Sequence, residues 1–381
     1  MNRLALGWNV AGLSPTDDLD AFRRDSRSPG DRSVIKEMRE SGSQTARERV
    51  LDLLDDGSFV EVDAFVRHRS GDHGMYMHTP LGDGVVAGHG MLDGRRVACF
   101  SQDFSVFSGT MGEMHAKKIS KVVEFAEKAR IPIIGIWDGD GQRAHEGVTS
   151  LGPNGDLLDN LVSCSGKVPM ISIILGTVSG TSALAAGLSD FVILGKQRGR
   201  MFMRSPYVIP EIISGEVDED TLGGANHHAS RSGVACLVSD SERGAFDMVA
   251  EILSHMPDHT MSEAPTLDSG DKWDRKCKGM GKLVPQDSDR PYDMRGVIGQ
   301  VFDDKRFLEL SPSYAENVVI GFARLDGHPV GVIGNQPSVL AGCLDIDASV
   351  KAARFIRTCD CFNIPIVTFV DVPGFLPGTV Q

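Results

Sequence analysis

The feature that most constrains the fold of this chain is an internal repeat. Residues 131–141 read IPIIGIWDGDG and residues 364–374 read IPIVTFVDVPG, so Ile364 follows Ile131 by 233 residues. Identical residues at the same spacing continue upstream, as the pairs Val85/Val318, Gly88/Gly321, Leu92/Leu325, Asp93/Asp326, Gly94/Gly327, Val97/Val330, Gly109/Gly342 and Lys118/Lys351. This spacing is far longer than the roughly 20–50 residues of a solenoid repeat, so the sequence predicts two copies of one domain.

The apolar runs of the first copy have the character of buried parallel strands. Ile131–Trp137 is uncharged and rich in β-branched residues, as is typical of a strand that is covered on both faces. A second run, Pro169–Leu175, ends at Gly176, and a third is Phe191–Leu194. Met111–Arg130 has helical spacing. Strands that alternate with helices predict right-handed βαβ units, and therefore an α/β fold.

The ends of two of these strands are the candidate functional sites. The run Ile131–Trp137 stops at Asp138-Gly139-Asp140-Gly141, and the run Pro169–Leu175 stops at Gly176. A strand that ends at glycines and opens a helix leaves backbone N–H groups unpaired, and such groups attract anions. If the protein is an enzyme, we expect part of its chemistry within residues 131–147.

Composition excludes several classes of function. The net charge of −13 argues against nucleic acid as a partner, although a phosphate-bearing small ligand needs only a local basic patch. Seven cysteines without CxxC pairs indicate a reducing compartment. No apolar run approaches the roughly 18 residues of a membrane span, and the N-terminus has no signal-peptide pattern. We therefore expect a cytoplasmic protein with no membrane partner.

Local composition divides the chain into four segments. Residues 1–32 are polar and rich in Gly, Pro and Ser, which predicts a flexible arm, and residues 33–256 hold the first copy. Residues 257–290, rich in Asp, Ser, Pro and Lys, form the predicted linker, and residues 291–381 hold a partial second copy. A complete second copy would extend to about residue 490, so we expect this chain to be a fragment of a protein of roughly 500 residues.

Seven stretches carry a more specific resemblance: TARERVLDLLDDGSFVEVD, GDGVVAGHG, FSQDFSVFSG, LGGANHHASRSGVA, YDMRGVIGQVFDD, VIGNQPSVLAGCLD and VDVPGFLPGT. In this order, over residues 33–381, they resemble the carboxyltransferase (β) subunits of biotin-dependent acyl-CoA carboxylases. The resemblance implies tandem crotonase-like domains, with the second incomplete here. The bacterial acetyl-CoA type carries a zinc ribbon of CxxC pairs, so their absence favours the propionyl-CoA carboxylase type without a metal site.

The resemblance also implies a reaction and its partners. A carboxyl group moves from carboxybiotin to the α-carbon of a short-chain acyl-CoA through an enolate. The first domain would hold acyl-CoA and the second would hold biotin, which is attached to a biotin carboxylase/biotin carrier subunit. The active site would be completed within a homo-oligomer of dimers. Such chemistry needs preorganised N–H groups and positioning more than a titrating side chain, so no Ser/His/Asp triad is predicted.

Site residues are assigned by the same resemblance. The catalytic oxyanion site is formed by backbone N–H groups of Asp140, Gly141 and Gln142. Acyl-CoA would be bound by Arg143, Gly180, Thr181, Ser182 and Ser205. The biotin side would use Pro373, Gly374 and Phe375. Arg143 has two open roles, since it could pair with Glu146 or face the phosphates of CoA.

The chain departs from the family pattern on the acyl-CoA side. Where the family has DSGGARIQEG and GPCAGGA, residues 138–147 read DGDGQRAHEG and residues 176–182 read GTVSGTS. Asp140 and Thr181 thus replace glycines. A Thr at a positive φ would be strained, and the Asp140 carboxylate would repel an enolate. Changing both residues to glycine is expected to raise turnover, because one oxyanion donor contributes on the order of 3 kcal/mol.

Two alternatives remain open at this point. The chain could be an acyl-CoA decarboxylase of the same family, or a catalytically degenerate, non-enzymatic subunit that binds partners.

The second-copy counterparts of residues 176–182 would fall at residues 409–415, beyond Gln381. We therefore expect residues 1–381 alone to bind acyl-CoA weakly and to transfer no carboxyl group.

Overall fold

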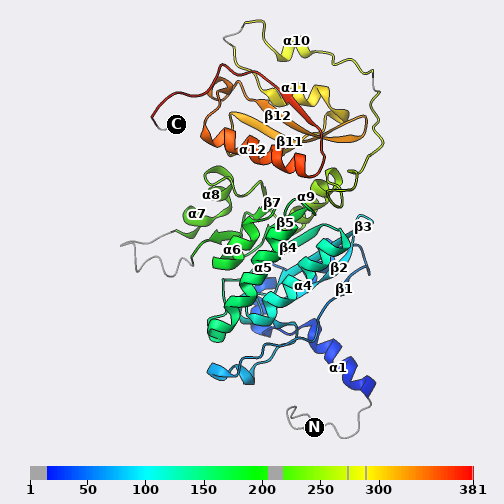
Figure 1. Cartoon of the computed structure of the whole chain (residues 1–381), viewed down its shortest axis with the longest axis vertical. Helices are drawn as coiled ribbons and strands as arrows, with labels where there is room; N and C mark the ends of the chain where they lie inside the picture. The colour runs from blue at the N-terminus through cyan, green and yellow to red at the C-terminus, as the bar shows by residue number, and fades with distance from the viewer. Residues whose placement is uncertain (1–14, 205–217, 273, 288–289, 380) are drawn as a thin grey trace.

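The computed structural model describes residues 15–204, 218–272, 274–287, 290–379 and 381, which form two stacked α/β units (Figure 1). In the first unit a seven-stranded sheet has the order β1-β2-β3-β4-β5-β7-β9. Its strands are β1 Val60–Glu61, β2 Val85–Leu92, β3 Arg95–Gln102, β4 Ile133–Trp137, β5 Met170–Ile174, β7 Phe191–Gly195 and β9 Leu237–Ser239. The first three pair antiparallel and the rest pair parallel. Every residue of β4, β5 and β7 is buried, which confirms the three predicted buried strands.

Helices and short 3-10 turns connect and cover these strands. The helices are α1 Pro15–Arg27, α2 Arg32–Glu40, α3 Ala46–Leu53, α4 Glu113–Ala129, α5 Leu151–Cys164, α6 Gly180–Gly187, α7 Glu219–Gly223, α8 Ala225–Ser230 and α9 Glu242–His255. The 3-10 turns of this unit are η1 Asp72–Met77, η2 Leu81–Gly84, η3 Phe107–Gly109 and η4 Ala144–Ser150. Strands β6 Thr177–Ser179 and β8 Arg200–Phe202 form a separate parallel pair beside the main sheet.

The second unit repeats the beginning of the first. Its sheet has the order β10-β11-β12-β13, with three antiparallel strands followed by a parallel one, as in β1 to β4. Its elements are β10 Leu308–Leu310, β11 Val318–Leu325, β12 His328–Asn335, β13 Ile366–Phe369, α10 Met280–Leu283, α11 Met294–Val301, α12 Ile346–Cys361, η6 Asp303–Lys305 and η7 Leu340–Gly342. The two-copy prediction is therefore confirmed in the order and direction of the strands.

Individual contacts also recur at the 233-residue spacing. The β-bridge between Met111 and Gln142 recurs between Leu344 and Phe375. The Lys118 Nζ donates to the Val85 carbonyl at 2.6 Å, and the Lys351 Nζ donates to the Val318 carbonyl at 2.7 Å. The Asp138 N–H donates to the Gln102 side chain at 3.1 Å, and the Asp371 N–H donates to the Asn335 side chain at 3.3 Å. The copies thus share tertiary contacts as well as strand order.

The repeat continues upstream at a second spacing. The ion pair between Arg47 and Glu61, 2.8 Å long, has a counterpart between Arg295 and Glu309 at 2.7 Å, 248 residues later. The segment from Glu61 to its strand partner Gly88 is 15 residues longer than the segment from Glu309 to its strand partner Gly321. An ungapped comparison at 233 residues ends at this insertion, so the upstream part of the repeat was not predicted.

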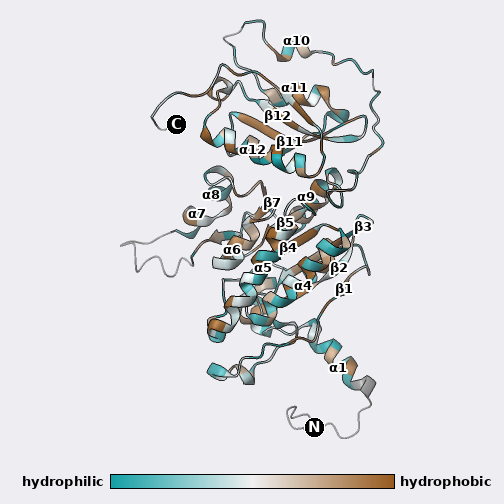
Figure 2. Ribbon diagram, viewed as in Figure 1, coloured by the Kyte–Doolittle hydropathy of each residue, from teal (hydrophilic) through white to brown (hydrophobic). Residues whose placement is uncertain are grey.

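The two units share one hydrophobic core. Figure 2 shows apolar residues along the central strands of both sheets. Phe322 of the second unit contacts Phe191 and stacks on His255 of the first, with ring centroids 6.0 and 5.7 Å apart. Buried side chains of both sheets, α9 and α12 thus belong to one hydrophobic cluster.

The predicted terminal arm and linker contain regular structure. Of the predicted arm, residues 1–14 lie outside the described residues, and Pro15–Arg27 form helix α1. In the predicted linker, Thr260 N–H donates to the Lys167 carbonyl of the first unit, and Arg275 donates to the Gln300 carbonyl of the second, both at 2.9 Å. In the described part of the chain no helix is long and apolar enough to cross a membrane.

Candidate active site

Two turns meet at the carboxyl ends of β4 and β5. We call residues 138–143 the first turn and residues 176–182 the second turn. Because β4 and β5 are parallel neighbours, the segments that follow them leave the sheet at the same edge. A Cβ atom on Gly176 would lie 1.7 Å from Asp138 Oδ1, and one on Gly141 would lie 2.9 Å from Ser179 Oγ. The two turns are therefore in direct contact.

The first turn is extended rather than helical. Gln142 forms a β-bridge with Met111, and helix α5 begins only at Leu151 after the 3-10 turn η4. The expectation that a helix opens directly at the glycines is wrong here, because Met111, far away in sequence, pairs with this backbone. Met111 N–H donates to the Gly141 carbonyl at 2.8 Å and Arg143 N–H donates to the Met111 carbonyl at 3.1 Å.

The three predicted oxyanion donors differ in availability. Asp140 N–H donates to the Ser108 carbonyl over a long 3.4 Å, and Gly141 N–H donates to the Gly139 carbonyl at 3.0 Å. The Gln142 N–H has no acceptor among the residues that the structure describes. In a parallel bridge of this kind the N–H of the bridged residue points away from its partner strand. Gln142 is therefore the donor of the first turn that a ligand can use.

The second turn opens a helix, as predicted. Ser179 is the N-cap of α6, but its side chain does not cap the helix. The first N–H groups of α6, those of Gly180, Thr181 and Ser182, have no partner within the helix. A positive φ of 57° falls on Gly180, and Thr181 has no positive φ. The expected strain at Thr181 is thus wrong, because the left-handed residue is the glycine before it.

Side chains connect the two turns. Ser179 Oγ donates to Asp140 Oδ1 at 2.6 Å, and Gln142 Nε2 donates to Thr181 Oγ1 at 3.4 Å. We call these four residues the cross-turn pairs. Ser179 is buried, Asp140 and Thr181 are half-buried and Gln142 is exposed. The cross-turn pairs therefore lie beside the N–H groups of both turns.

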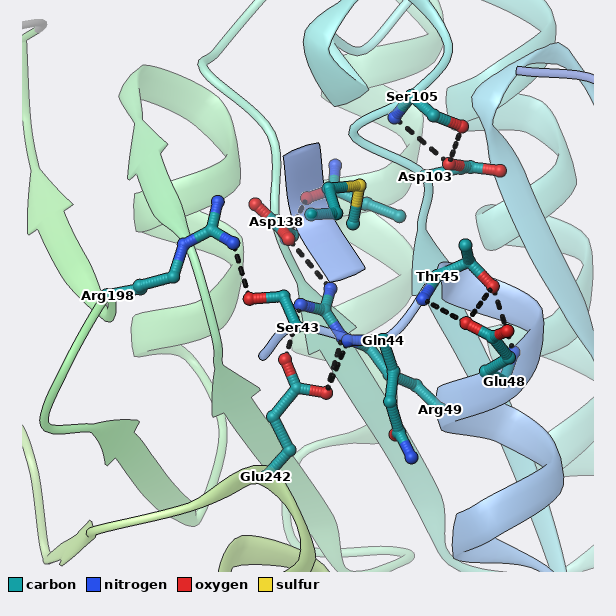
Figure 3. A network of polar contacts seen from close by, with 12 residues as sticks. Ser43, Gln44, Thr45, Glu48, Arg49, Asp103, Ser105, Asp138, Arg198 and Glu242 are labelled. Carbon is teal, nitrogen blue, oxygen red and sulfur yellow. Dashed lines mark hydrogen bonds and ion pairs between the residues drawn. The ribbon is translucent and has the colours of Figure 1, made fainter. Parts of the chain in front are cut away.

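A buried ion-pair network holds the start of the first turn (Figure 3). Arg49 of α3 donates to Asp138 Oδ2 at 2.7 Å and, on its other side, to Glu242 at 2.7 and 3.2 Å. Burial alone would lower the pKa of Arg49, but the charges of Asp138 and Glu242 outweigh it and raise the pKa. Arg49 thus ties the first turn to α3 and α9, and Asp138 in turn contacts Gly176 of the second turn.

The side chain of Arg143 has a structural role. Its guanidinium is buried and donates to Asp83 at 2.5 Å and to Glu146 at 2.8 Å, and it lies over the ring of Phe107. Of the two roles that the sequence left open, the structure shows the pairing with Glu146. A buried guanidinium with two carboxylate partners is not available to a CoA phosphate, so the predicted contact of Arg143 with acyl-CoA is wrong.

The other predicted binding residues have different surroundings. The Ser182 hydroxyl is buried and has no hydrogen-bond partner in the described part of the chain. Ser205 lies outside the described residues.

The turn after β13, which the resemblance assigned to biotin, copies the first turn. Leu344 N–H donates to the Gly374 carbonyl at 3.1 Å, and Leu376 N–H donates to the Leu344 carbonyl at 2.8 Å. Phe375 therefore corresponds to Gln142, and its N–H likewise has no acceptor among the described residues. Pro373 stands at the position of Asp140 and has no N–H to offer.

A basic cavity of about 650 Å³, which was not predicted from the sequence, lies between α2, α3 and the end of β3. Its lining includes five cationic side chains: Arg27, Arg32, Lys36, Arg39 and Arg47. Three carboxylates, Glu40, Glu48 and Asp103, also line it, so cations are in excess. Arg32, Lys36 and Arg39 have helical i, i+4, i+7 spacing, and this signal could have revealed the basic face.

The cavity and the first turn share one wall. Asp103 lines the cavity directly after β3, and the preceding residue, Gln102, accepts the hydrogen bond from the Asp138 N–H. Asp103 is also close enough to Asp138 for their charges to interact. Among the described residues there is no cluster of His, Cys, Asp and Glu that could hold a metal ion.

Comparison with known proteins places this geometry in a family. The model of the carboxyl transferase domain matches residues 37–381. The biotin-dependent acetyl-/propionyl-coenzyme A carboxylase beta5 subunit of Mycobacterium tuberculosis is 46% identical over 371 residues, which are 96% of this chain and 68% of that protein. Methylmalonyl-CoA decarboxylase subunit alpha of Veillonella parvula is 44% identical over 355 residues, which are 93% of this chain and 70% of that protein. The transcarboxylase 12S structure with methylmalonyl-coenzyme A bound has a TM-score of 0.93 at 39% identity, covering 96% of this chain and 71% of that one.

Proposed function

Because this chain belongs to the carboxyl transferase domain family, we propose that it carries the acyl-CoA side of a carboxyl transfer to the α-carbon of a short-chain acyl-CoA. The observation that supports this most strongly is the pair of turns at the ends of β4 and β5. Their free N–H groups, those of Gln142 and of the start of α6, belong to turns whose side chains meet at the Gln142–Thr181 contact.

The chemistry assigned to this chain is stabilisation of an enolate. When the α-carbon of the thioester loses its proton, negative charge develops on the thioester oxygen. The Gln142 N–H and the first N–H groups of α6, with the positive end of its dipole, would donate to that oxygen. Each such donor contributes on the order of 3 kcal/mol, or about a hundredfold in rate. The enolate carbon would then form its new bond to the carboxyl carbon as that carbon's bond to the ureido nitrogen of carboxybiotin breaks, and this nitrogen would take up the α-proton.

The basic cavity would hold the phosphates of CoA. Arg27 and Arg32 line it without an ion-pair partner among the described residues, whereas Arg39 pairs with Glu48 at 2.6 Å. Arginine and lysine are the side chains that bind phosphate oxygens most readily. The acyl-CoA contact that the sequence assigned to Arg143 would thus be supplied by α2 and its neighbours.

The second unit, residues 291–381, would form the biotin side. A biotin on a biotin carboxylase/biotin carrier subunit would supply the carboxyl group. The free N–H and exposed side chain of Phe375 are compatible with a ligand at this turn, while Pro373 removes one donor that the first turn has. We further propose that the chain assembles as a homo-oligomer of dimers, in which the acyl-CoA and biotin sides of neighbouring subunits meet.

The experiment is a transfer assay on the holoenzyme with acetyl-CoA or propionyl-CoA, biotin carboxylase, carboxylated carrier and labelled bicarbonate. The proposal predicts label in malonyl-CoA or methylmalonyl-CoA, and loss of the label when Arg32, Lys36 and Arg39 are replaced by alanine. Acyl-CoA that binds but never acquires label would contradict a transferase role.

A decarboxylase is the second candidate, and the 44% identity to the Veillonella parvula protein favours keeping it. It would use the same N–H groups for the same enolate, formed by loss of a carboxyl group. Methylmalonyl-CoA and uncarboxylated carrier test it in the same assay. Faster decarboxylation than carboxylation at equal substrate would assign the chain to this direction.

A further inference from the structure

We propose that Gln102 and His115 are positioning residues for the first turn, which they hold through a relay of hydrogen bonds that has only one possible direction. Both side chains are fully buried, Gln102 at the end of β3 and His115 in α4. They therefore act through the backbone that they hold and not on a ligand. The inference rests on the proposed function and adds to it the side chains that place its backbone donors.

The relay consists of three contacts. The Asp138 N–H donates to Gln102 Oε1 at 3.1 Å. The other end of the same amide, Gln102 Nε2, lies 3.4 Å from His115 Nε2. On the far side of the imidazole, His115 Nδ1 lies 3.0 Å from the Asp83 carbonyl oxygen. These contacts connect the start of the first turn to the backbone of η2.

The backbone groups at the two ends of the relay fix every hydrogen within it. A backbone N–H can only donate, so the Gln102 atom that faces Asp138 is the oxygen, and its NH2 faces His115. A carbonyl can only accept, so His115 carries its proton on Nδ1. Its Nε2 is then the acceptor that the Gln102 NH2 needs. The relay is thus satisfied by the neutral Nδ1–H imidazole.

The surroundings of His115 keep it in that form. Burial, with the charges of Arg143 and Lys118, lowers the pKa of His115 well below 6.5, although its hydrogen bond to the Asp83 carbonyl acts to raise it. The Asp83 carboxylate accepts instead from Arg143 at 2.5 Å and from the backbone N–H of His115 at 2.9 Å. A proton on His115 Nε2 would face the Gln102 NH2, so protonation would break the relay.

The start of α4 holds both ends of the first turn. His115 holds the beginning of the turn through Gln102, and Met111, four residues before His115, forms the β-bridge to Gln142. A Cβ atom on Gly139 would lie 3.1 Å from Gln102 Oε1, so the turn rests directly against this amide. Because Gln142 supplies the N–H that a ligand can use, the place of that donor depends on the relay and the bridge together.

The repeat provides an internal comparison. Gln102 corresponds to Asn335, which accepts from the first N–H of the turn after β13 at 3.3 Å and donates to the Gly342 carbonyl at 3.0 Å. His115 corresponds to Ala348, which cannot titrate. A side-chain amide thus holds the turn in both copies, whereas the imidazole behind it belongs to the first copy.

The test compares Gln102→Leu and Gln102→Glu in the transfer assay on the holoenzyme between pH 6 and pH 9. Gln102→Leu keeps the size of the side chain but removes both of its hydrogen bonds. We expect kcat to fall about 100-fold, because a displaced donor costs about that much, while KM for acyl-CoA stays within about threefold of the wild-type value. CoA titration of the same variant shows that it is folded.

Gln102→Glu should rescue the rate at low pH only. A carboxylate can accept from the Asp138 N–H and from a doubly protonated His115, so this variant should raise the pKa of His115. The turn would then be held while His115 is protonated, and the rate should fall as the pH rises through the raised pKa. A merely structural role for Gln102 predicts no such reversal.

Asn160→Leu is the control. It removes a half-buried amide that joins α5 to Ser120 and Glu124 of α4, and it should leave the rate and its pH dependence unchanged. A wild-type kcat in Gln102→Leu, or a wild-type pH profile in Gln102→Glu, would overturn the inference.

The protonation of His115 tests the relay without any measurement of activity. NMR of protein labelled with ¹³C and ¹⁵N in histidine, assigned by the signal lost in His115→Ala, should show the neutral Nδ1–H form at pH 7. An Nε2–H form in wild-type protein would overturn the inference even if carboxyl transfer occurs. The Nδ1–H form in a holoenzyme that binds CoA but transfers no label would instead overturn the proposed function, and the positioning role with it.

Discussion

At the scale of single residues, Arg49 has the largest structural role near the site. Its guanidinium is fully buried and is the cation for Asp138 and Glu242 (Figure 3). Removing one partner of a buried ion pair leaves an uncompensated charge and costs about 3–5 kcal/mol. We therefore expect Arg49→Met to lower the free energy of unfolding by that amount, measured by urea unfolding followed by tryptophan fluorescence.

The matched control for Arg49 is Arg243→Met. Arg243 is exposed and pairs with Asp52 and Asp247, and a surface pair of this kind contributes at most about 1 kcal/mol. If both variants lost the same small stability, the buried network would not be what holds the first turn.

Free backbone N–H groups were predicted where strands end at glycines, and those of Gln142 and the start of α6 have no partner among the described residues. Their role as an oxyanion site stays a prediction, and two further predicted donors, Asp140 and Gly141, are already hydrogen-bonded. The burial of Arg143 was not predictable in this way, because one partner, Asp83, lies 60 residues earlier in the chain. Strain was predicted at Thr181 because the family has glycine at that position. The positive φ belongs instead to the preceding residue, Gly180.

At the scale of elements, the buried strands and their order were predictable because a strand covered on both faces must be a short apolar run. The repeat then predicted the second sheet from the first. The basic cavity was not predicted, since it forms only where α2 and α3 pack beside the end of β3. The extended first turn was missed for the same reason, because its partner Met111 precedes α4.

Helix α9 carries a pH-sensitive contact between the two units. Burial lowers the pKa of His255 to about 4, although its hydrogen bond to the Glu251 carbonyl acts to raise it. Below pH 6.5 the unfolded chain binds a proton that the folded chain excludes until about pH 4. Stability should therefore fall by up to about 3 kcal/mol as the pH decreases through this window.

His255→Phe should reduce this pH dependence, since the ring can still stack on Phe322 but carries no titrating group. Burial also lowers the pKa of His115, so part of the slope should remain. His145→Phe, at an exposed histidine, is the matched control. Thermal midpoints measured between pH 4 and pH 7 that have the same slope in wild-type and H255F protein would refute the assignment.

At the scale of the whole molecule, exposed apolar side chains on the second unit predict self-association. Ile346, Val350 and Ile356 of α12 are 43–53% exposed, and Phe375 is 77% exposed. The first-copy counterpart of Ile356 is Val123 of α4. Val123 is fully buried, because α5 packs against α4. We expect sedimentation at micromolar concentration to detect dimers or larger species. A well-behaved monomer there would contradict the proposed homo-oligomer.

The central claim is that the first unit binds acyl-CoA and that the phosphates of CoA lie in the basic cavity. The most direct measurement is calorimetric titration of CoA into wild-type protein, the variant R32A/K36A/R39A and the control R23A/R24A/K128A. The control removes the same charge from side chains that do not line the cavity. The account predicts that the cavity variant binds CoA at least about tenfold more weakly than wild-type protein, since charge-assisted hydrogen bonds contribute about 1.5–3 kcal/mol each, while the control changes the affinity by less than about twofold. Equal CoA affinity in all three proteins would contradict it.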